Sequence, residues 1–255
     1  MIAAYLADEL KRGGRYFIRR SRGLRPAKNF DASAHLTNYY ATVAEFLHHP
    51  KTPNGTGIVL THGASGNCAA PLLVAVADAL SAAGALVLRY DLPCRLKRPS
   101  GPPSPATASA DREGIKQAAT RMRSLVSGPV IIAGHSYGGR QSSMLAAEEP
   151  GLAEALLLLS YPLHPPGKPT QPRTGHFPGL RTPALFVSGS KDAFGTPDEF
   201  AAALSLIPAK TRLVTLERAG HDLAKGRFDL HEKLVQPLFQ LANFRTNSAT
   251  TASNL

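Results

Sequence analysis

Short apolar runs alternate with longer amphipathic segments along this chain. Six runs are rich in Val, Ile, Leu and Ala and are bounded by Gly, Pro or polar residues: Gly57–Thr61, Ala85–Tyr90, Val130–Ala133, Ala155–Ser160, Ala184–Ser188 and Arg212–Leu216. Such runs are typical of strands buried on both faces of a parallel sheet. The β-branched and aromatic content of Tyr39–His48 favours an additional, outer strand.

Segments with helical spacing lie between these runs. They are rich in alanine and leucine and span Pro71–Ala83, Ala108–Val126, Tyr137–Glu149, Pro197–Leu206 and Phe228–Phe244. The fourth has a clear start signal, because Thr196 can cap it and Glu199 completes a capping box. Strands that alternate with helices predict the α/β class, with a mostly parallel sheet and helices on both faces.

Two proline-rich stretches interrupt this alternation, Pro93–Ala108 and Tyr161–Pro183. Both follow predicted strands, so we expect them at the carboxyl edge of the sheet, where open α/β folds bind ligands. The second contains too many prolines for a helical lid domain, which predicts an open site without a large lid.

The bulk composition is that of one folded domain. A chain of 255 residues with 43% hydrophobic content can bury a full core. We expect a basic amino-terminal extension (residues 1–36), a folded domain (37–245) and a short polar, disordered tail (246–255). No apolar run reaches the ~20 residues that a membrane span needs, and Asp8 and Glu9 interrupt any signal-like stretch. With two cysteines and no disulfide framework, a cytoplasmic location is expected.

The net charge of +11 is concentrated at the amino terminus. Between Met1 and Lys28 there are eight basic residues and two acids, a charge of +6, which leaves +5 for the rest of the chain. A solvated basic extension is the commoner explanation for such a segment. Nucleic-acid binding is not expected, since no aromatic-and-basic recognition module accompanies it.

The chemistry suggested by the sequence centres on Ser136. The stretch "IIAGHSYGGR" places this serine in a Gly-x-Ser-x-Gly pentapeptide, directly after an apolar run and before a helical segment. A strand, a sharp glycine-flanked turn and a helix are the three parts of a nucleophile elbow. We therefore predict that Ser136 is a nucleophile; an ordinary glycine-rich turn is the alternative.

A serine nucleophile needs a base and an acid, and the chain offers both in suitable places. Asp192 follows the run "PALFVSG", and His221 follows the run "TRLVTLE". The order serine, acid, histidine, each after a strand, is that of a Ser–His–Asp triad in an α/β fold. Two competing acids are less suitable: Asp198 falls within a predicted helix, and Asp222 is expected to cap a helix or lie on the surface.

The same pattern suggests residues around the triad. The backbone N–H groups of Tyr137 and Ala64 are the expected oxyanion donors, with Ser65 as an alternative to Ala64. His135 is expected to shape the substrate pocket, and His164 could contact substrate from the second proline-rich stretch. Basic residues in the two stretches hint at an anionic substrate: Arg95, Lys97, Arg98, Lys168 and Arg173.

No metal or cofactor is expected. The chain contains no HExxH, no CxxC pair and no GxxxxGK[ST], and "GHSYGG" does not follow the first predicted strand as a dinucleotide fingerprint would. Cys68 and Cys94 follow neighbouring strands and could approach each other, but we expect two small buried hydrophobes.

These motifs together resemble the α/β-hydrolase superfamily. "LTHGASG", "LRYDLP", "GHSYGGR", "SGSKDAFGT" and "AGHDL" occur in its order, and with "LLLSYPLHPPGKP" they resemble a dienelactone-hydrolase-like branch. That branch includes a subunit of the non-specific-lethal histone acetyltransferase complex and a testis-expressed protein. The resemblance covers roughly residues 43–244 and implies about eight strands and a Ser136–Asp192–His221 triad. Dienelactone hydrolases have cysteine where this chain has Ser136, so their chemistry is not transferred.

The sequence therefore predicts a serine hydrolase that acts on carboxylic esters through an acyl-enzyme, with thioester and peptide substrates left open. The alternative is a catalytically idle scaffold of the same fold, which binds a protein or nucleic-acid partner. The oligomeric state does not follow from the sequence.

Overall fold

The computed structural model of the chain describes residues 45–99 and 101–242. The predicted extension (1–36) and the predicted tail (246–255) lie outside the described residues, as does most of the predicted outer strand. No helix within the described ranges is both long and apolar enough to cross a membrane.

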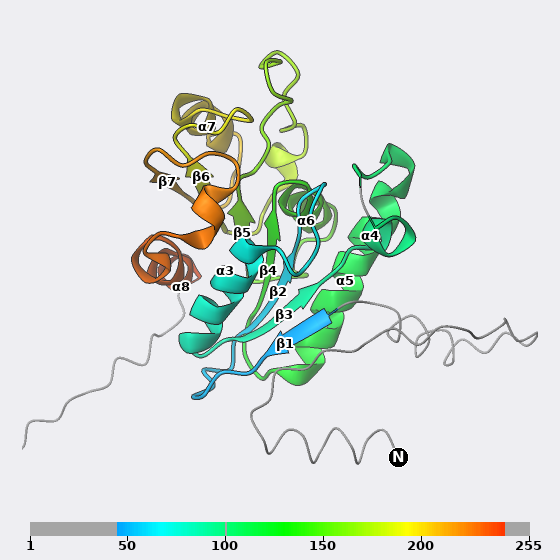
Figure 1. The fold of residues 1–255 in the computed structure, drawn as a ribbon, viewed down its shortest axis with the longest axis vertical. Coiled ribbons are helices and arrows are strands. Elements are labelled where there is room, and N and C mark those ends of the chain that lie inside the picture. Colours follow the sequence, from blue (N-terminus) through cyan, green and yellow to red (C-terminus); the bar gives the residue numbers. More distant parts are fainter. Residues whose placement is uncertain (1–44, 100, 243–255) are drawn as a thin grey trace, which may run out of the picture.

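One sheet runs through the described residues (Figure 1). Its seven strands, against about eight expected, are β1 (Glu45–His48), β2 (Gly57–Thr61), β3 (Leu86–Tyr90), β4 (Val130–His135), β5 (Ala155–Leu159), β6 (Ala184–Gly189) and β7 (Thr211–Leu216). Their order in the sheet is β1-β3-β2-β4-β5-β6-β7. Only β1 is antiparallel to its neighbour; every other pair is parallel, as the sequence predicts.

Helices cover both faces of this sheet (Figure 1). The α-helices are α3 (Pro71–Ala82), α4 (Pro93–Lys97), α5 (Ala108–Leu125), α6 (Tyr137–Glu148), α7 (Pro197–Leu204) and α8 (Gln236–Leu241). Helices α3 and α8 share one apolar core with the sheet, and α5, α6 and α7 share the core on the opposite face. The α/β class with a doubly covered sheet is thus confirmed.

The central strands supply both cores through the twofold alternation of their side chains. In β4, Ile131 and Ala133 belong to the core under α3, while Val130 and Ile132 belong to the core under α5 and α6. All four side chains are fully buried. Because both faces are covered, the strand reads as a continuous apolar run.

The chain changes direction at the middle of the sheet. From β2 it moves outward to β3 and then returns to β4 on the other side of β2. The loops that leave β2 and β4 therefore diverge at the carboxyl edge, and such a topological switch point is where ligands bind in open α/β sheets. The loop after β2 contains Ala64, and the turn after β4 contains Ser136.

Two predicted segments differ from the structure. The stretch Pro93–Ala108 was expected to be irregular, but it contains α4 and the 3-10 turn η1 (Pro105–Thr107). The expected helix Phe228–Phe244 is shorter: a π-helical turn η4 (His231–Val235) leads into α8. Pro237 lies in the first turn of α8 and has no N–H, so it interrupts the regular α-helical hydrogen bonding that a single long helix needs.

The stretch Tyr161–Pro183 forms no helical lid. Its only regular element is the 3-10 turn η2 (Phe177–Gly179). The carboxyl edge of the sheet thus carries loops rather than an additional domain. The remaining short element, η3 (Leu223–Gly226), packs against α3.

Candidate active site

Ser136 lies on a sharp turn between β4 and α6. Its φ of 49° and ψ of −112° lie outside the regions that non-glycine residues normally adopt. The turn closes because Gly134 and Gly138 have no side chains: a Cβ at Gly134 would lie 2.5 Å from the Gly139 nitrogen, and one at Gly138 would lie 2.5 Å from the His62 oxygen. This is the strained strand–turn–helix geometry of a nucleophile elbow.

The strained turn is fixed by hydrogen bonds to its neighbours. The Ser136 N–H donates to the Leu159 carbonyl at 2.8 Å, which ties the turn to the end of β5. The Ser136 carbonyl in turn accepts from the Arg140 N–H at 2.9 Å as α6 begins. These surrounding contacts allow a strained backbone conformation, which costs of order 1–3 kcal/mol, to persist at Ser136.

The structure brings Ser136, Asp192 and His221 together. The His221 Nε2 lies 2.8 Å from the Ser136 Oγ, and the His221 Nδ1 lies 3.0 and 2.9 Å from the two Asp192 carboxylate oxygens. Since a carboxylate only accepts, Nδ1 carries the proton of a neutral imidazole, and Nε2 is left to accept from the serine hydroxyl. The geometry suits removal of the serine proton as the oxygen attacks.

Contacts between the loop of Asp192 and the loop of His221 fix the acid and the base relative to each other. The Lys191 N–H donates to the Ala219 carbonyl at 2.9 Å, and a Cβ at Gly189 would lie only 2.2 Å from the Ala219 oxygen. Asp192 also accepts a hydrogen bond from the Phe194 N–H at 3.0 Å and is 4% exposed. A buried carboxylate with several donors is fixed in orientation.

Two aromatic rings lie next to the His221 imidazole. The Phe194 ring stacks on the imidazole, with centroids 4.2 Å apart and an interplanar angle of 29°. The His135 ring lies 5.3 Å away on a tilted plane. A ring face attracts a cation, so Phe194 is suitably placed to favour the imidazolium that forms when His221 takes a proton.

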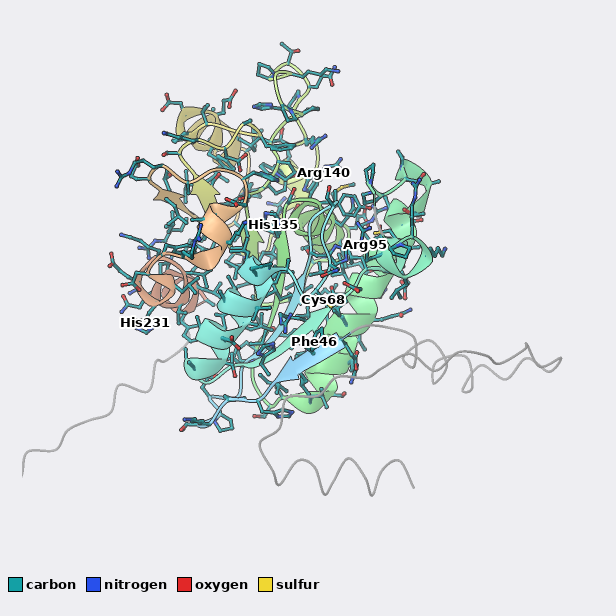
Figure 2. The ribbon with its side chains drawn as sticks, in the orientation of Figure 1. Phe46, Cys68, Arg95, His135, Arg140 and His231 are labelled. Atoms are coloured by element: carbon teal, nitrogen blue, oxygen red, sulfur yellow. The ribbon has the colours of Figure 1, made fainter. Side chains whose placement is uncertain are left out.

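His135 also contacts the backbone of His221. Its Nε2 lies 2.9 Å from the His221 carbonyl oxygen, which can only accept, so His135 is the donor. Burial lowers the pKa of His135 to about 4, so its imidazole is neutral at pH 7. Figure 2 labels this residue at the carboxyl end of β4. His135 thus links the serine turn to the loop of the base.

The loop after β2 packs directly against the serine. A Cβ at Gly63 would lie 3.3 Å from the Ser136 Cβ and 2.8 Å from the His135 Nδ1. Ala64, the predicted oxyanion donor, follows at the next position. The second predicted donor, Tyr137, is the first residue of α6, where backbone N–H groups have no partner within the helix.

Two buried side chains hold this loop in place. The His62 ring is fully buried: its Nδ1 donates to the Gly63 carbonyl at 2.9 Å, and its Nε2 accepts from the Leu92 N–H at 3.0 Å. The Arg95 guanidinium donates to the Ala64 carbonyl at 2.5 Å and also to the carbonyls of Arg98 and Gly101. Arg95 was expected to be one of the charges facing a substrate, but it is 6% exposed and its guanidinium binds backbone oxygens instead.

Asp111 is a buried carboxylate that the sequence analysis did not identify. It is fully buried in α5 and accepts from the Tyr137 hydroxyl at 2.7 Å and from the Cys94 N–H at 2.7 Å. Asp111 therefore joins the start of α6 to the start of α4. Its helical position gave no signal in the sequence, because an acidic residue in an amphipathic helix is normally solvated.

The other predicted positions are placed as follows. His164 is 7% exposed; its Nδ1 donates to the Pro165 carbonyl at 2.8 Å and its Nε2 lies 3.2 Å from a Glu199 carboxylate oxygen at the start of α7. The role of His164 in substrate binding stays a prediction.

The Asp222 carboxylate accepts from the Ala224 N–H at 3.1 Å and caps η3, as expected. The capping box of Thr196 and Glu199 is present as well.

Cys68 and Cys94 are both buried. Burial raises the pKa of both thiols, that of Cys94 to about 12. They therefore behave as the small buried hydrophobes that we expected. Within the described residues, no group of three or more His, Cys, Asp or Glu side chains is placed to hold a metal ion.

The chain belongs to the family described as "Alpha/beta hydrolase domain". The family model matches residues 54–238, a range that contains Ser136, Asp192 and His221. This result agrees with the resemblance inferred from the motifs.

Solved structures share the fold at low sequence identity. An α/β serine hydrolase homologue from Coxiella burnetii is 18% identical, with a TM-score of 0.58 and coverage of 79% of this chain and 90% of that chain. Est1E from Butyrivibrio proteoclasticus, solved with ferulic acid bound, is 21% identical, with a TM-score of 0.61 and coverage of 79% and 93%. A dienelactone hydrolase from Anabaena variabilis is 19% identical, with a TM-score of 0.56 and coverage of 79% and 90%. The three neighbours bear out the fold and include a dienelactone hydrolase.

Proposed function

We propose that this protein is a serine hydrolase that cleaves carboxylic esters through an acyl-enzyme. The observation that carries the proposal is the aligned set of contacts from Asp192 to His221 and from His221 to the Ser136 oxygen. The family and the solved neighbours, which include proteins described as serine hydrolases, support hydrolase activity in general. Carboxylesterase activity is the more specific part of the proposal, with thioesters as the nearest alternative.

The mechanism has two halves that use the same residues. His221 accepts the Ser136 proton as Oγ attacks the ester carbonyl, and Asp192 stabilises the resulting imidazolium. The backbone N–H groups of Tyr137 and Ala64 donate to the oxyanion, and the imidazolium then protonates the leaving alcohol. His221 next removes a proton from water, which attacks the acyl-enzyme and releases the acid, restoring Ser136.

The remaining predictions from the sequence stay with this proposal. They are a small-molecule ester as substrate, no metal or cofactor requirement, a cytoplasmic location and kinship with the branch that contains the non-specific-lethal complex subunit.

Labelling with a fluorophosphonate probe tests the proposal. Wild-type protein should label and should hydrolyse short-chain p-nitrophenyl esters, whereas Ser136→Ala and His221→Ala should lose labelling and on the order of 10⁴- to 10⁶-fold in kcat. Ser205→Ala, which changes an exposed serine, is the matched control and should behave as wild type. A folded wild-type protein that does not label would overturn the proposal and favour the idle scaffold.

A further inference from the structure

Arg140 and Arg173 are near enough for the charge of one to act on the other. Arg140 lies one helical turn after Ser136, and Arg173 lies in the stretch that follows β5. Neither guanidinium forms an ion pair with an acid in residues 45–99 and 101–242. The Arg140 Nε is buried and has no hydrogen-bond partner within the same ranges. Buried polar groups of this kind are uncommon in folded proteins.

Hydrogen bonds anchor the backbone of each arginine. The Tyr161 hydroxyl donates to the Arg173 carbonyl at 2.7 Å, and the Arg173 N–H donates to the Leu163 carbonyl at 2.7 Å. On the α6 side, the Ser143 hydroxyl contacts both the Arg140 carbonyl at 3.0 Å and the His176 Nε2 at 2.8 Å. Figure 2 labels Arg140 where α6 approaches the loop after β5.

The charged groups of this cluster are the two guanidinium groups of Arg140 and Arg173. Burial lowers the pKa of Arg173, and the neighbouring Arg140 charge lowers it further. Burial also lowers the pKa of His176 to about 4, and Arg140 acts in the same direction. No carboxylate contributes to either shift. Like charges brought together without compensation destabilise a fold, so the arrangement is best explained by an anion that binds there.

Both arginines belong to segments that begin at the carboxyl edge of the sheet, where Ser136 lies. A long helical side chain leans toward the helix N-terminus, so the Arg140 side chain extends back toward the end of α6 that begins at Ser136. Four residues of helix span about 6 Å, a distance that a chain of a few carbons can bridge. Arg140 and Arg173 are both half-buried, so each keeps part of its surface exposed.

We propose that Arg140 and Arg173 form an anion subsite that binds a carboxylate or phosphate group carried by the acid portion of the ester substrate. This inference rests on the proposed hydrolase function and adds the substrate class: esters whose acyl chain ends in an oxyanion. Guanidinium groups bind such oxyanions through paired hydrogen bonds.

Paired esters of similar chain length test the subsite in the active enzyme. The ratio of kcat/KM for the mono-p-nitrophenyl ester of glutaric acid to that for p-nitrophenyl butyrate should exceed one in the wild type. Arg173→Gln should lower this ratio roughly tenfold or more, because a charge-assisted hydrogen bond is lost, and should change turnover of the butyrate less than about twofold. Arg140→Lys keeps the positive charge but loses the paired N–H donors of the guanidinium. It should therefore also lower the ratio of the two kcat/KM values. Arg181→Gln, on the exposed end of the same loop, should leave the ratio unchanged.

Calorimetric titration of Ser136→Ala with glutarate and with inorganic phosphate measures anion binding without turnover. Binding that Arg173→Gln removes supports the subsite, and the anion that binds more tightly identifies its chemistry. If wild type hydrolyses the butyrate ester but shows no charge preference and no anion titration, the subsite is wrong and the hydrolase proposal stands. If Arg173-dependent titration is present but the wild type does not react with fluorophosphonate, the anion site stands and the hydrolase proposal fails.

Discussion

The His135 ring donates a hydrogen bond of 2.9 Å to the backbone carbonyl of His221, so the residue before the nucleophile positions the loop of the base. His135→Phe should therefore lower kcat roughly tenfold or more with little change in KM, because the imidazole shifts relative to Ser136 Oγ. His135→Gln retains a side-chain N–H and should recover part of the loss. Steady-state kinetics on a p-nitrophenyl ester checks both variants; a change in KM alone would contradict the positioning role.

The contact between Asp192 and His221 fixes the imidazole tautomer. Asp192→Asn offers an amide in place of one carboxylate oxygen and should lower kcat by about 10⁴-fold, as in the serine-protease template, because Nδ1 no longer holds the proton. Thermal unfolding should show that the variant remains folded. Asp198→Asn, an exposed acid in α7, serves as the control and should keep full activity.

Arg95 holds the loop that contains Ala64. Arg95→Met should lower kcat by roughly tenfold to a hundredfold, since a small displacement of an oxyanion donor is costly. Lys97→Met, an exposed neighbour in α4, should be close to wild type. Equal kcat values for the two variants would show that the Arg95 guanidinium does not hold the loop of Ala64 in its catalytic position.

The strain at Ser136 predicts an unusual stability order. Ser136→Ala keeps a Cβ at φ 49°, whereas Ser136→Gly removes it. The glycine variant should exceed the alanine variant in free energy of unfolding by about 1 kcal/mol. Urea denaturation of the two inactive variants measures the difference directly. A less stable glycine variant would mean that the turn is relaxed with serine in place.

Buried neutral histidines predict acid sensitivity. Burial lowers the pKa of His135 and of His176 from 6.5 to about 4, and it lowers that of His62 as well. Below pH 6.5 the unfolded chain takes up protons on these histidines that the folded chain does not. The free energy of unfolding is therefore unaffected by them above pH 6.5, and it decreases as the pH falls from 6.5 toward 4. The slope is about 1.4 kcal/mol per pH unit for each group.

Denaturation between pH 7 and 5 tests this slope. His135→Phe and His176→Phe should each flatten it by one group's share, provided that they remain folded. His49→Phe changes an exposed histidine next to β1, and it should leave the slope intact. An unchanged slope in both core variants would show that these imidazoles ionise in the folded protein.

The residues that follow strands could be predicted well from the sequence. Ser136, Asp192 and His221 each lie in the loop or turn after an apolar run, and a parallel sheet brings the ends of such runs to one edge. Arg95 and Asp111 could not be predicted in the same way, because their roles depend on tertiary contacts with Ala64 and Tyr137. From the sequence alone, a basic residue in a proline-rich loop and an acid in an amphipathic helix are both expected to be solvent-exposed. Only the tertiary structure shows that they are buried.

The loops at the carboxyl ends of the strands and the turns at their amino ends differ in function. Ser136, Asp192, His221 and the loop of Ala64 all lie at the carboxyl edge, and the turns at the opposite edge only return the chain to the next strand. Gly151, in the turn between α6 and β5, has no atom within 4 Å of the place where a side chain would begin. Extra residues or a fused reporter domain inserted there would extend into solvent on the side away from the substrate. The amino edge is thus the natural place at which to tether or tag this molecule while its chemistry continues.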